Sequence, residues 1–576
     1  MLIYGDRSRR ARMRDVLEQL DLAAAGLEAP RDDRAGWIGR HAALVDLFID
    51  AAGLVQAIED AAFAATGVDR LTPDAEARAG ALVDLARTVM LSFETGTLPS
   101  TAEARALVAR LAGGGPAEDL RIRTAEGYAY YALYPEAYGE AGRVLAGGSP
   151  AVLGLRSIGT GLGAMVAAAA GAGLFATLRP VGDVFERRLA LDKNLRHRLA
   201  ARAAFPAAIV DEGPGQSGSS MAGAAAALEE LGMPAGKLHF FSSHGGAPGS
   251  AATDAVRQRW NTTPRHVRTL DDLAGAGWLR LAAWVEDLTG PAIAPLIDIG
   301  GGRWRDHRAF TRRPPGGLMR ERRKFLLTSR AGTFLLRFAG LGATGAAAVD
   351  RAMRLARAGL TPPVLGLRHG FLVERWLGDA VVPEEHGDDA GLLAHVADYL
   401  AFRARYLPAG ARDGAPLTEL AAMAERNLGL LARAPVDMGA LAADAAQLAP
   451  RVRRVATDNR LHRWEWLRLP DGRLLKADAS DHCAGHDLIG CQDIAWDVVG
   501  ASVELGLDAA ALTAALERRG VKVDTALTAF YRPCYAAFEA GSFYLDASNT
   551  SEYPDKFLLE DQILRYLKTI NVRQPD

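Results

Sequence analysis

Strands and helices alternate along the chain from about residue 121. The apolar segments PAVLGL at 150–155, LFATLRPV at 174–181 and PAAIVDE at 206–212 are typical of buried strands, and helical segments rich in small residues separate them. The aromatic segment GYAYYALYPEAY at 127–138 is also strand-like. Because alternating strands and helices form parallel sheets, which bind ligands at the carboxyl ends of their strands, the pattern predicts an α/β domain with a site at that edge.

The chain is too long for one hydrophobic core. With 576 residues, two to four domains are expected. Apolar side chains recur at three- and four-residue spacings over residues 1–120, which predicts a helical N-terminal region. We assign residues 121–272 to the α/β domain, 273–317 to a linker or cap, and 318–576 to a further domain. The linker is rich in glycine and arginine and could contact phosphates, although we favour a solvated basic segment.

Charge and cysteine content narrow the class of protein. The formal net charge of -2 indicates neither a basic protein that coats nucleic acid nor a chain with an acidic tail. Three cysteines are too few for a disulfide framework, which suits a reducing compartment. The N-terminus has no apolar segment typical of a secretory signal, and the small-residue run at 163–178 is too short and glycine-rich to span a bilayer. We therefore expect a cytoplasmic protein without membrane or nucleic-acid partners, and the sequence leaves its oligomeric state open.

Two acids and a glycine-rich loop follow one of the predicted strands. In AAIVDEGPGQSGSS at 207–220, Asp211 and Glu212 end the strand, and a loop of Gly, Ser and Gln leads into a helix. Backbone N–H groups of such a loop and the helix N-terminus can cradle a phosphate. The two carboxylates would repel that phosphate, so they must face hydroxyl donors or a divalent cation, and a ribose offers the hydroxyls. The alternative is an ordinary anion loop of a Rossmann-like sheet.

This arrangement resembles the motif that binds phosphoribosyl pyrophosphate (PRPP) in type I phosphoribosyltransferases. The resemblance implies that Asp211 and Glu212 hold the ribose hydroxyls and serve in catalysis. It implies that the 5′-phosphate is bound by Gly213, Gly215, Gln216, Ser217, Gly218, Ser219 and Ser220. The loop is one residue longer than the common pattern, and serines stand where the family has threonines.

A second loop lies upstream, where this family places its pyrophosphate loop. The segment VLGLRSIGTGLGAMVAA at 152–168 is a strand, a short turn and a helix. The resemblance implies pyrophosphate contacts from Arg156, Ser157, Ile158, Gly159 and Thr160, with Arg179, Arg187 and Arg188 as further cations. The implied reaction is displacement at the anomeric carbon by a small-molecule acceptor, with Mg²⁺ neutralising the leaving pyrophosphate.

Residues from about 318 to 570 resemble the aminoglycoside/choline-kinase-like branch of the protein-kinase fold. The resemblance rests on the hairpin KFLLTSRAGTFLLRF at 324–338, on ARAGLTPPVLG at 356–366, on HGFLVERWLG at 369–378 and on the segment GRLLKADASDH. It implies a bilobal α+β fold that binds ATP and Mg²⁺. The implied site residues are Arg337 in place of the phosphate-binding lysine, Glu374 near the adenine and Asp478 as a metal ligand, with Asp493 and Asp497 bracing the helical lobe.

The catalytic-loop segment departs from that family. TDNRLHRWEWL at 457–467 places Arg460 where the family has its catalytic aspartate and Glu465 where it has the metal-binding asparagine. Asp458, two residues earlier, is the remaining candidate base. Because an arginine does not accept a proton from a substrate hydroxyl, the departure argues against ordinary phosphoryl transfer. An altered kinase, a nucleotide-binding pseudokinase and a scaffold remain open.

A cysteine- and histidine-containing stretch follows Asp478. His482, Cys483, His486 and Cys491 could ligate zinc, but their spacing matches no common zinc module, and we interpret them as loop and core residues.

The predicted fold is α/β and α+β, with a helical N-terminal region, a Rossmann-like parallel-sheet phosphoribosyltransferase domain and a bilobal kinase-like domain. The expected function is a pentosyltransferase reaction on PRPP and a small-molecule acceptor, in the biosynthesis or salvage of a nucleotide-like metabolite or in a stress response. Mg²⁺ is the expected cofactor, and ATP is the expected ligand of the C-terminal half. The alternative is a non-catalytic sensor of PRPP or nucleotide, or a scaffold, with a pseudokinase half.

Overall fold

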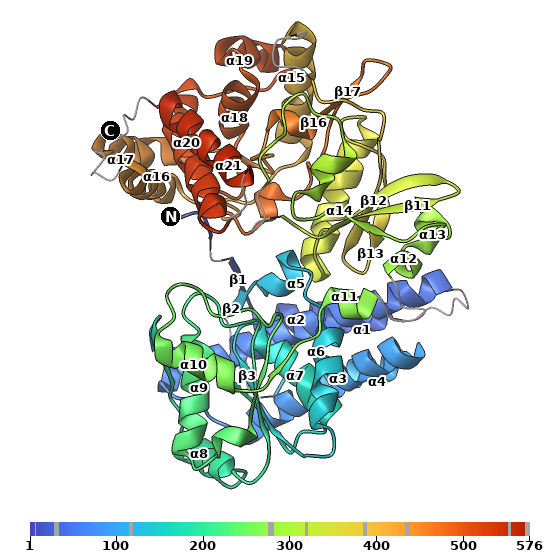
Figure 1. Cartoon of the computed structure of the whole chain (residues 1–576), viewed down its shortest axis with the longest axis vertical. Helices are drawn as coiled ribbons and strands as arrows, with labels where there is room; N and C mark the ends of the chain where they lie inside the picture. Colours follow the sequence, from blue (N-terminus) through green and yellow to red (C-terminus); the bar gives the residue numbers. More distant parts are fainter. Residues whose placement is uncertain are drawn as a thin grey trace.

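The computed structural model describes residues 1–5, 7–27, 34–113, 119–274, 281–316, 321–383, 389–432, 438–550 and 554–570. It shows a multidomain protein that combines helices with parallel and antiparallel sheets. In Figure 1 the N-terminal helices and the parallel sheet occupy the lower half, and the antiparallel sheet and the C-terminal helices occupy the upper half. The proposed boundary between residues 317 and 318 lies outside the described residues.

A five-stranded parallel sheet forms the centre of the lower half. Its strands are β3 (Ala151–Leu155), β4 (Leu174–Leu178), β7 (Ala207–Val210), β8 (Leu238–Phe241) and β9 (Arg265–His266). They lie in the order β4-β3-β7-β8-β9, and every neighbouring pair is parallel. The winding direction reverses between β3 and β7, and doubly wound sheets bind ligands outside the carboxyl ends of the strands at this switch point. The predicted parallel sheet is therefore present, and both predicted loops leave it at the switch point.

Helices connect these strands, and a hairpin is inserted after β4. The connections contain α7 (Gly159–Ala170), α8 (Lys193–Ala200), α9 (Ser219–Glu230), α10 (Asp254–Thr262) and the hairpin β5 (Pro180–Asp183)–β6 (Glu186–Leu189). Glycine is required where α7 begins against the sheet, because a Cβ on Gly154 would lie 2.1 Å from the carbonyl oxygen of Gly159.

The N-terminal region is helical, as predicted, and it packs directly against the α/β domain. Its elements are β1 (Ser8–Ala11), α1 (Met13–Ala25), α2 (Arg34–Thr66), α3 (Pro73–Thr95), α4 (Thr101–Arg110) and β2 (Leu120–Arg123). One apolar core runs from Leu44 in α2 through Leu162 in α7 to Phe338 in the upper half. The segment Trp37–Thr66 is long and apolar enough to cross a membrane, but 61% of its most apolar window is buried inside the protein.

The aromatic segment at 127–138 differs from its prediction, because it forms two helices and no strand. These are α5 (Glu126–Tyr130) and α6 (Pro135–Gly142), which begins with a proline at its first position. Proline is favoured at the start of a helix because the first N–H groups need no intrahelical partner. The buried tyrosines Tyr128, Tyr134 and Tyr138 then pack into the core between the two halves.

The upper half begins with an antiparallel sheet. Its strands are β10 (Ile297–Asp298), β11 (Lys324–Ser329), β12 (Gly332–Phe338), β13 (Val364–Arg368) and β14 (Phe371–Arg375), in the order β10-β11-β12-β14-β13. Helix α14 (Gly342–Arg357) connects β12 to β13 and packs on this sheet. A sheet lobe with one helix, followed by a helical lobe, is the arrangement that the kinase-like resemblance implies.

The helical lobe completes the upper half. Its helices are α15 (Asp389–Tyr406), α16 (Leu417–Ala432), α17 (Gly439–Leu448), α18 (Ala495–Leu505), α19 (Ala509–Arg518), α20 (Thr525–Ser548) and α21 (Asp555–Thr569). The short hairpin β16 (Trp466–Arg468)–β17 (Leu474–Lys476) leads to the segment that contains Asp478. The chain's N-terminus also joins this lobe: the backbone N–H of Leu2 donates to Oδ1 of Asn427 at 2.7 Å. In Figure 1 the N-terminus accordingly lies beside α16 and α20.

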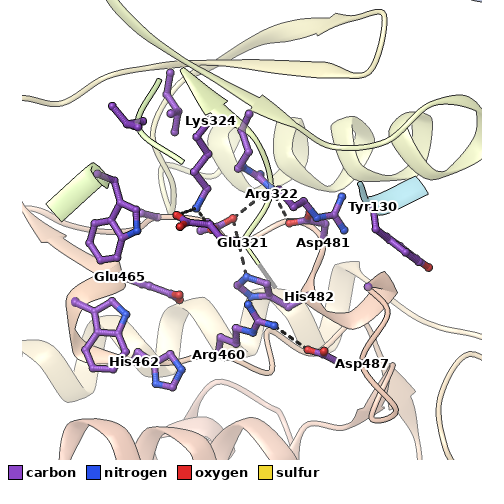
Figure 2. Close-up of a pocket in the computed structure, with 18 of the residues that line it drawn as sticks. Tyr130, Glu321, Arg322, Lys324, Arg460, His462, Glu465, Asp481, His482 and Asp487 are labelled. Atoms are coloured by element: carbon purple, nitrogen blue, oxygen red, sulfur yellow. Dashed lines mark hydrogen bonds and ion pairs between the residues drawn. The ribbon is translucent and has the colours of Figure 1, made fainter. Parts of the chain in front are cut away.

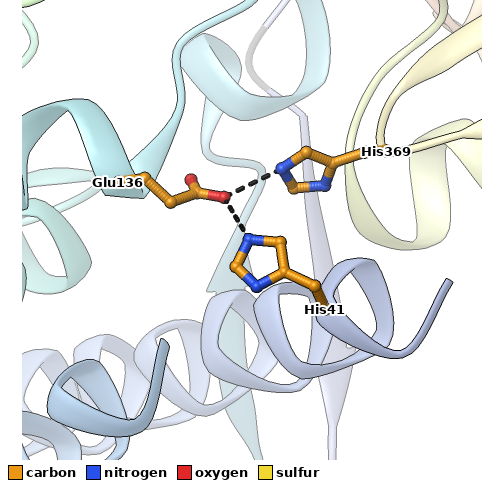
Figure 3. Close-up of side chains that lie close together, drawn as sticks. All are labelled: His41, Glu136 and His369. Carbon is orange, nitrogen blue, oxygen red and sulfur yellow. Dashed lines mark hydrogen bonds and ion pairs between the residues drawn. The ribbon is translucent and has the colours of Figure 1, made fainter. Parts of the chain in front are cut away.

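A buried polar cluster joins the two halves (Figure 3). His41 from α2 and His369 from the β13–β14 turn both approach Oε1 of Glu136 in α6, with Nε2 atoms at 2.9 and 2.8 Å. The three side chains are at most 1% exposed, and Nδ1 of His41 is held by the Ser92 hydroxyl at 2.9 Å. Burial alone would raise the pKa of Glu136, but His369 and His41 hold it well below the usual range. The cluster fixes the antiparallel sheet to the α/β half.

Candidate functional sites

Asp211 and Glu212 stand immediately after β7 at the switch point of the parallel sheet. Oδ1 of Asp211 accepts the backbone N–H of Glu212 at 2.8 Å, and the Tyr138 hydroxyl donates to the carbonyl oxygen of Asp211 at 2.8 Å. The Glu212 carboxylate accepts the backbone N–H of Gly127 in α5. These contacts fix the backbone on which the two carboxylates are carried.

The electrostatic environment of this acid pair favours the protonated forms. Burial raises the pKa of Asp211 to about 7. Burial, together with the nearby charges of Asp211 and Glu126, raises the pKa of Glu212 to about 8. Neither carboxylate forms an ion pair within the described part of the chain, and the nearby Arg179 pairs with Asp60 instead. Partly buried acids without a cation partner are typical of sites that bind a cation or hydroxyl donors.

The loop after the acid pair has the backbone geometry of an anion site. Gly215 and Gly218 adopt left-handed conformations, with φ of +56° and +66°, and turn the chain into the N-terminus of α9. Two predicted phosphate donors are used otherwise: the hydroxyls of Ser217 and Ser219 both donate to the carbonyl oxygen of Val184 at 2.8 Å. In this structure they fasten the β5–β6 hairpin over the loop, and their role as phosphate donors stays a prediction.

The remaining loop residues stay candidates for the phosphate. Gly213, Gln216 and Ser220 are at least partly exposed, as is Gly215, and Ser220 lies in the first turn of α9. A Cβ on Gly213 would lie 3.0 Å from Nε2 of His244, so the segment after β8 approaches the loop from the other side.

The upstream loop is built differently from its prediction. The Arg156 side chain is 2% exposed, with Nε 2.9 Å from Asp60, Nη2 2.5 Å from Asp69 and Nη1 donating to the carbonyl oxygen of Thr177. It therefore ties α2 to the sheet and is not available to a pyrophosphate. Ile158, Gly159 and Thr160 are also buried, and Ser157 alone of the five predicted residues is partly exposed.

A second candidate site is a cavity of about 240 Å³ between the antiparallel-sheet lobe and the helical lobe (Figure 2). We call it the inter-lobe cleft. Its aromatic lining consists of Tyr4, Tyr130, Tyr131, Trp304, Trp376 and Trp464. Its charged lining consists of Arg308, Glu321, Arg322, Lys324, Arg337, Arg460, Glu465, Asp478, Asp481, Asp487 and Asp546, with His462, His482 and His486. Tyr130 and Tyr131 reach the cleft from the α5 segment of the α/β half.

The structure brings together Arg337, Glu374 and Asp478, which the sequence analysis placed in one site. Nη1 of Arg337 lies 3.2 Å from Asp478 and 2.7 Å from Asp481, and its Nε lies 3.7 Å from Glu374. Nζ of Lys324 lies 3.1 Å from the other Asp478 oxygen. Burial alone would raise the pKa of Asp478, but Lys324 and Arg337 hold it well below the usual range.

The predicted Mg²⁺ ligands Asp478 and Glu465 both form ion pairs with cationic side chains. Asp478 is bound by Lys324 and Arg337, and Glu465 accepts from Nζ of Lys476 at 2.6 Å. The Lys476 side chain is fully buried. Mg²⁺ requires near-octahedral oxygen ligands, and these carboxylates already neutralise cationic side chains. In this structure the two carboxylates belong to a set of buried ion pairs, and the metal site stays a prediction.

Asp458 is not placed to act as a base. Its side chain is fully buried, 3.5 Å from Nζ of Lys476, 3.7 Å from Nη1 of Arg403 and 3.3 Å from Nδ1 of His482. Burial would raise its pKa, but Lys476, His482 and Arg403 together hold it well below the usual range. A general base must reach the substrate proton and have a pKa near the working pH, so these contacts argue against the predicted catalytic role of Asp458.

The bracing role of Asp497 agrees with the geometry. Its carboxylate accepts the backbone N–H groups of Asp458 and Asn459 at 2.7 and 3.0 Å and so fixes the loop that carries Arg460. Of the cysteine- and histidine-containing stretch, His482 belongs to two potential metal-ligand clusters among the described residues, one with Asp458 and Glu465 and one with Asp478 and Asp481.

Sequence reasoning missed the residues that close the cleft. Lys324 and Lys476 lie in the quoted strand segments, but their ion pairs depend on contacts with residues more than ten positions away. Tyr131 follows α5, and its hydroxyl lies 2.5 Å from Nδ1 of His486 in the helical lobe. For Tyr131, the aromatic composition of residues 127–138 is the sequence feature that could have indicated this role.

No protein-family model and no curated protein matches this chain. Solved structures with some likeness include the choline kinase LicA from Streptococcus pneumoniae, at 12% identity over 50% of this chain and 96% of that chain, with a TM-score of 0.33. A choline/ethanolamine kinase family protein from Mesorhizobium loti has 17% identity over 52% and 92%, with a TM-score of 0.32. A macrolide 2'-phosphotransferase type I has 15% identity over 51% and 97%, with a TM-score of 0.32. At these TM-scores the likenesses support no functional conclusion.

Proposed function

We propose that the α/β half of this chain binds PRPP with Mg²⁺ and forms or cleaves a ribosyl bond. One observation carries the proposal: Asp211 and Glu212 end β7 at the switch point, next to a loop with two left-handed glycines that opens α9. Ligands of doubly wound sheets bind at this position.

The acid pair has the properties that ribose and Mg²⁺ require. Neither carboxylate forms an ion pair with a cationic side chain of the described residues, in contrast to the acids of the inter-lobe cleft. The raised pKa values of about 7 and 8 mean that a bound cation would drive both groups to the ionised form near neutral pH. Mg²⁺, when bound, would neutralise charge on the pyrophosphate. The loop would position the 5′-phosphate through its backbone N–H groups.

Release of pyrophosphate tests the proposal. Wild-type protein with PRPP, Mg²⁺ and a pool of nucleobases and amines is expected to release pyrophosphate. The Asp211→Asn/Glu212→Gln variant, which keeps the size of both side chains, is expected not to. Release at the wild-type rate by this variant would contradict the assignment. Binding of PRPP without release would favour the sensor alternative.

The inter-lobe cleft supports a second candidate function, nucleotide binding without phosphoryl transfer. Arg337, Glu374 and Asp478 meet between a sheet lobe and a helical lobe, whereas Asp458 is buried and ion-paired. We therefore expect ligand binding in the cleft and no release of the terminal phosphate of ATP above background. Phosphate transfer from ATP to water or to a hydroxyl compound would contradict this second candidate.

A further inference from the structure

We infer that the inter-lobe cleft binds a nucleoside monophosphate, an aromatic base with one phosphate group, and that it does so without a divalent cation. This inference rests on the proposal that the cleft is a nucleotide site. It extends that proposal by naming the ligand class. It also states that binding needs no metal ion, whereas a kinase-like cleft would be expected to use one.

Three cationic side chains neutralise the acids that could hold a metal. Lys324 and Arg337 contact the two oxygens of Asp478 at 3.1 and 3.2 Å. Lys476 lies 2.6 Å from Glu465 and 3.5 Å from Asp458. A metal ion that entered would displace these cations and leave them buried without a counter-charge, which is strongly unfavourable.

Lys476 is the clearest case of a lysine that stands in place of a metal ion. Ligand atoms of Asp458, Glu465 and His482 lie within 4.8 Å of one another, which is close enough to hold one ion. The Lys476 ammonium contacts two of these three groups and is fully buried. Its single fixed charge replaces a mobile cation, so the cleft keeps its charge balance in the absence of metal.

This charge balance limits the ligand to a small anion. The lining contains five lysine and arginine side chains and six aspartates and glutamates, besides three histidines. Because the acids already engage much of this positive charge, a metal-free triphosphate would face uncompensated repulsion. A single phosphate needs fewer cationic partners.

Lys324 and Arg460 are the side chains best placed to meet that phosphate. They enter the cleft from opposite lobes, as Figure 2 shows. Their side chains are 15% and 22% exposed, whereas Arg337 is 1% exposed. Arg460 lies 2.9 Å from Asp487 through Nη2, and Nζ of Lys324 donates to Asp478 at 3.1 Å and to Glu321 at 3.5 Å, which leaves one of its three N–H donors for a ligand.

The aromatic wall provides the surface for a base. Trp376 lies under the guanidinium of Arg308 at 4.7 Å, and Tyr130 lies under that of Arg322 at 5.4 Å. Trp464 stacks on His462 with ring centroids 4.5 Å apart. Flat aromatic ligands pack well against such rings, and the adjacent cations add electrostatic attraction to the base.

Calorimetric titration of the full chain tests the inference. The probes are AMP, GMP, CMP and UMP, each in EDTA and in Mg²⁺, and ATP with Mg²⁺. We expect at least one monophosphate to bind with affinities that agree within about twofold in EDTA and in Mg²⁺, and more tightly than ATP with Mg²⁺. Arg460→Met should weaken that binding at least about tenfold. Arg473→Met, an exposed arginine of the β16–β17 hairpin, is the control and should leave it unchanged.

The outcomes separate this inference from the function on which it rests. Nucleotide binding that requires Mg²⁺ would overturn the inference and leave the nucleotide site standing. Absence of binding by all five nucleotides would overturn both.

A lysine substitution gives an independent readout. Lys476→Met should make the thermal stability of the protein respond to Mg²⁺, since it exposes the acids to a cation, whereas the wild-type midpoint should not respond. If Lys476→Met does not fold, Lys324→Met serves instead, because ligand atoms of Asp478, Asp481 and His482 also lie within 4.8 Å. A wild-type protein stabilised by Mg²⁺ as strongly as the folded variant would contradict the inference.

Discussion

Replacement of Asp211 by asparagine should stabilise the α/β half while removing its proposed ligand. Burial raises the pKa of Asp211 from 3.8 to about 7. Between these values the folded protein holds a proton that the unfolded chain has released. The unfolded state therefore binds fewer protons, and stability falls as the pH rises through this window. Asparagine does not titrate, so it does not lower the stability as the pH rises. Its Oδ1 can still accept the backbone N–H of Glu212.

The size of the effect follows from the width of the window. Each pKa unit corresponds to about 1.4 kcal/mol of unfolding free energy. The Asp211→Asn variant should therefore gain about 1.5 kcal/mol over wild type at pH 5 and at most about 4 kcal/mol at pH 8. Above pH 7 the gain should stay constant, since Asp211 is then ionised in both states.

The assay must report on the parallel sheet rather than on the whole multidomain chain. Pulsed hydrogen exchange of peptides from β3 and β7, followed against urea concentration at each pH, gives the midpoint of this part of the protein. Asp183→Asn is the matched control: Asp183 is exposed in the β5–β6 hairpin and also accepts a backbone N–H, from Phe185 at 2.9 Å. A gain that does not grow between pH 4 and pH 7, or a loss of stability at pH 8, would refute the reasoning.

Two further predictions concern the contacts that hold the fold together. Glu136→Gln should destabilise the junction of the two halves by about 3 kcal/mol at pH 7, because it removes the charge that His41 and His369 share. Calorimetry of this variant and of Glu140→Gln, a partly exposed control in the same helix, should show the difference shrinking as the pH falls below 4.5, because the unfolded chain then binds a proton at Glu136 that the folded protein, with its lowered pKa, does not. Gly154→Ala should cost about 3 kcal/mol, since its Cβ meets the carbonyl oxygen of Gly159. Gly39→Ala, in α2 with nothing within 4 Å, should instead stabilise by about 0.5–1 kcal/mol; equal thermal midpoints for the two glycine variants would contradict this.

The sequence predicted the parallel sheet because its apolar strands alternate with helical segments long enough to cross over between parallel strands. Alternating apolar strands and helices admit few topologies, and the acids after the strand that ends at Val210 mark its carboxyl end. The segment at 127–138 was mistaken for a strand, because aromatic residues favour strands locally. Its helices depend on Pro135 at a helix start and on tyrosines that pack between the two halves.

The site residues were less predictable, because their roles depend on partners distant in sequence. Arg156 has the residue type and place of a pyrophosphate ligand, but Asp60 and Asp69 capture it from the N-terminal region. Asp478 and Glu465 likewise match metal ligands by position alone. No local pattern reveals that Lys324 and Lys476 neutralise them across the cleft.

The affinity of the protein for PRPP is the measurement that tests the central claim most directly. Calorimetric titration with PRPP and Mg²⁺ at pH 8 compares wild type, Asp211→Asn/Glu212→Gln and the control Asp183→Asn. We predict binding by wild type and the control, and a loss of at least about tenfold in affinity, or about 1.4 kcal/mol, in the double variant. A folded wild-type protein that does not bind PRPP, or a double variant that binds it as tightly as wild type, would contradict the account.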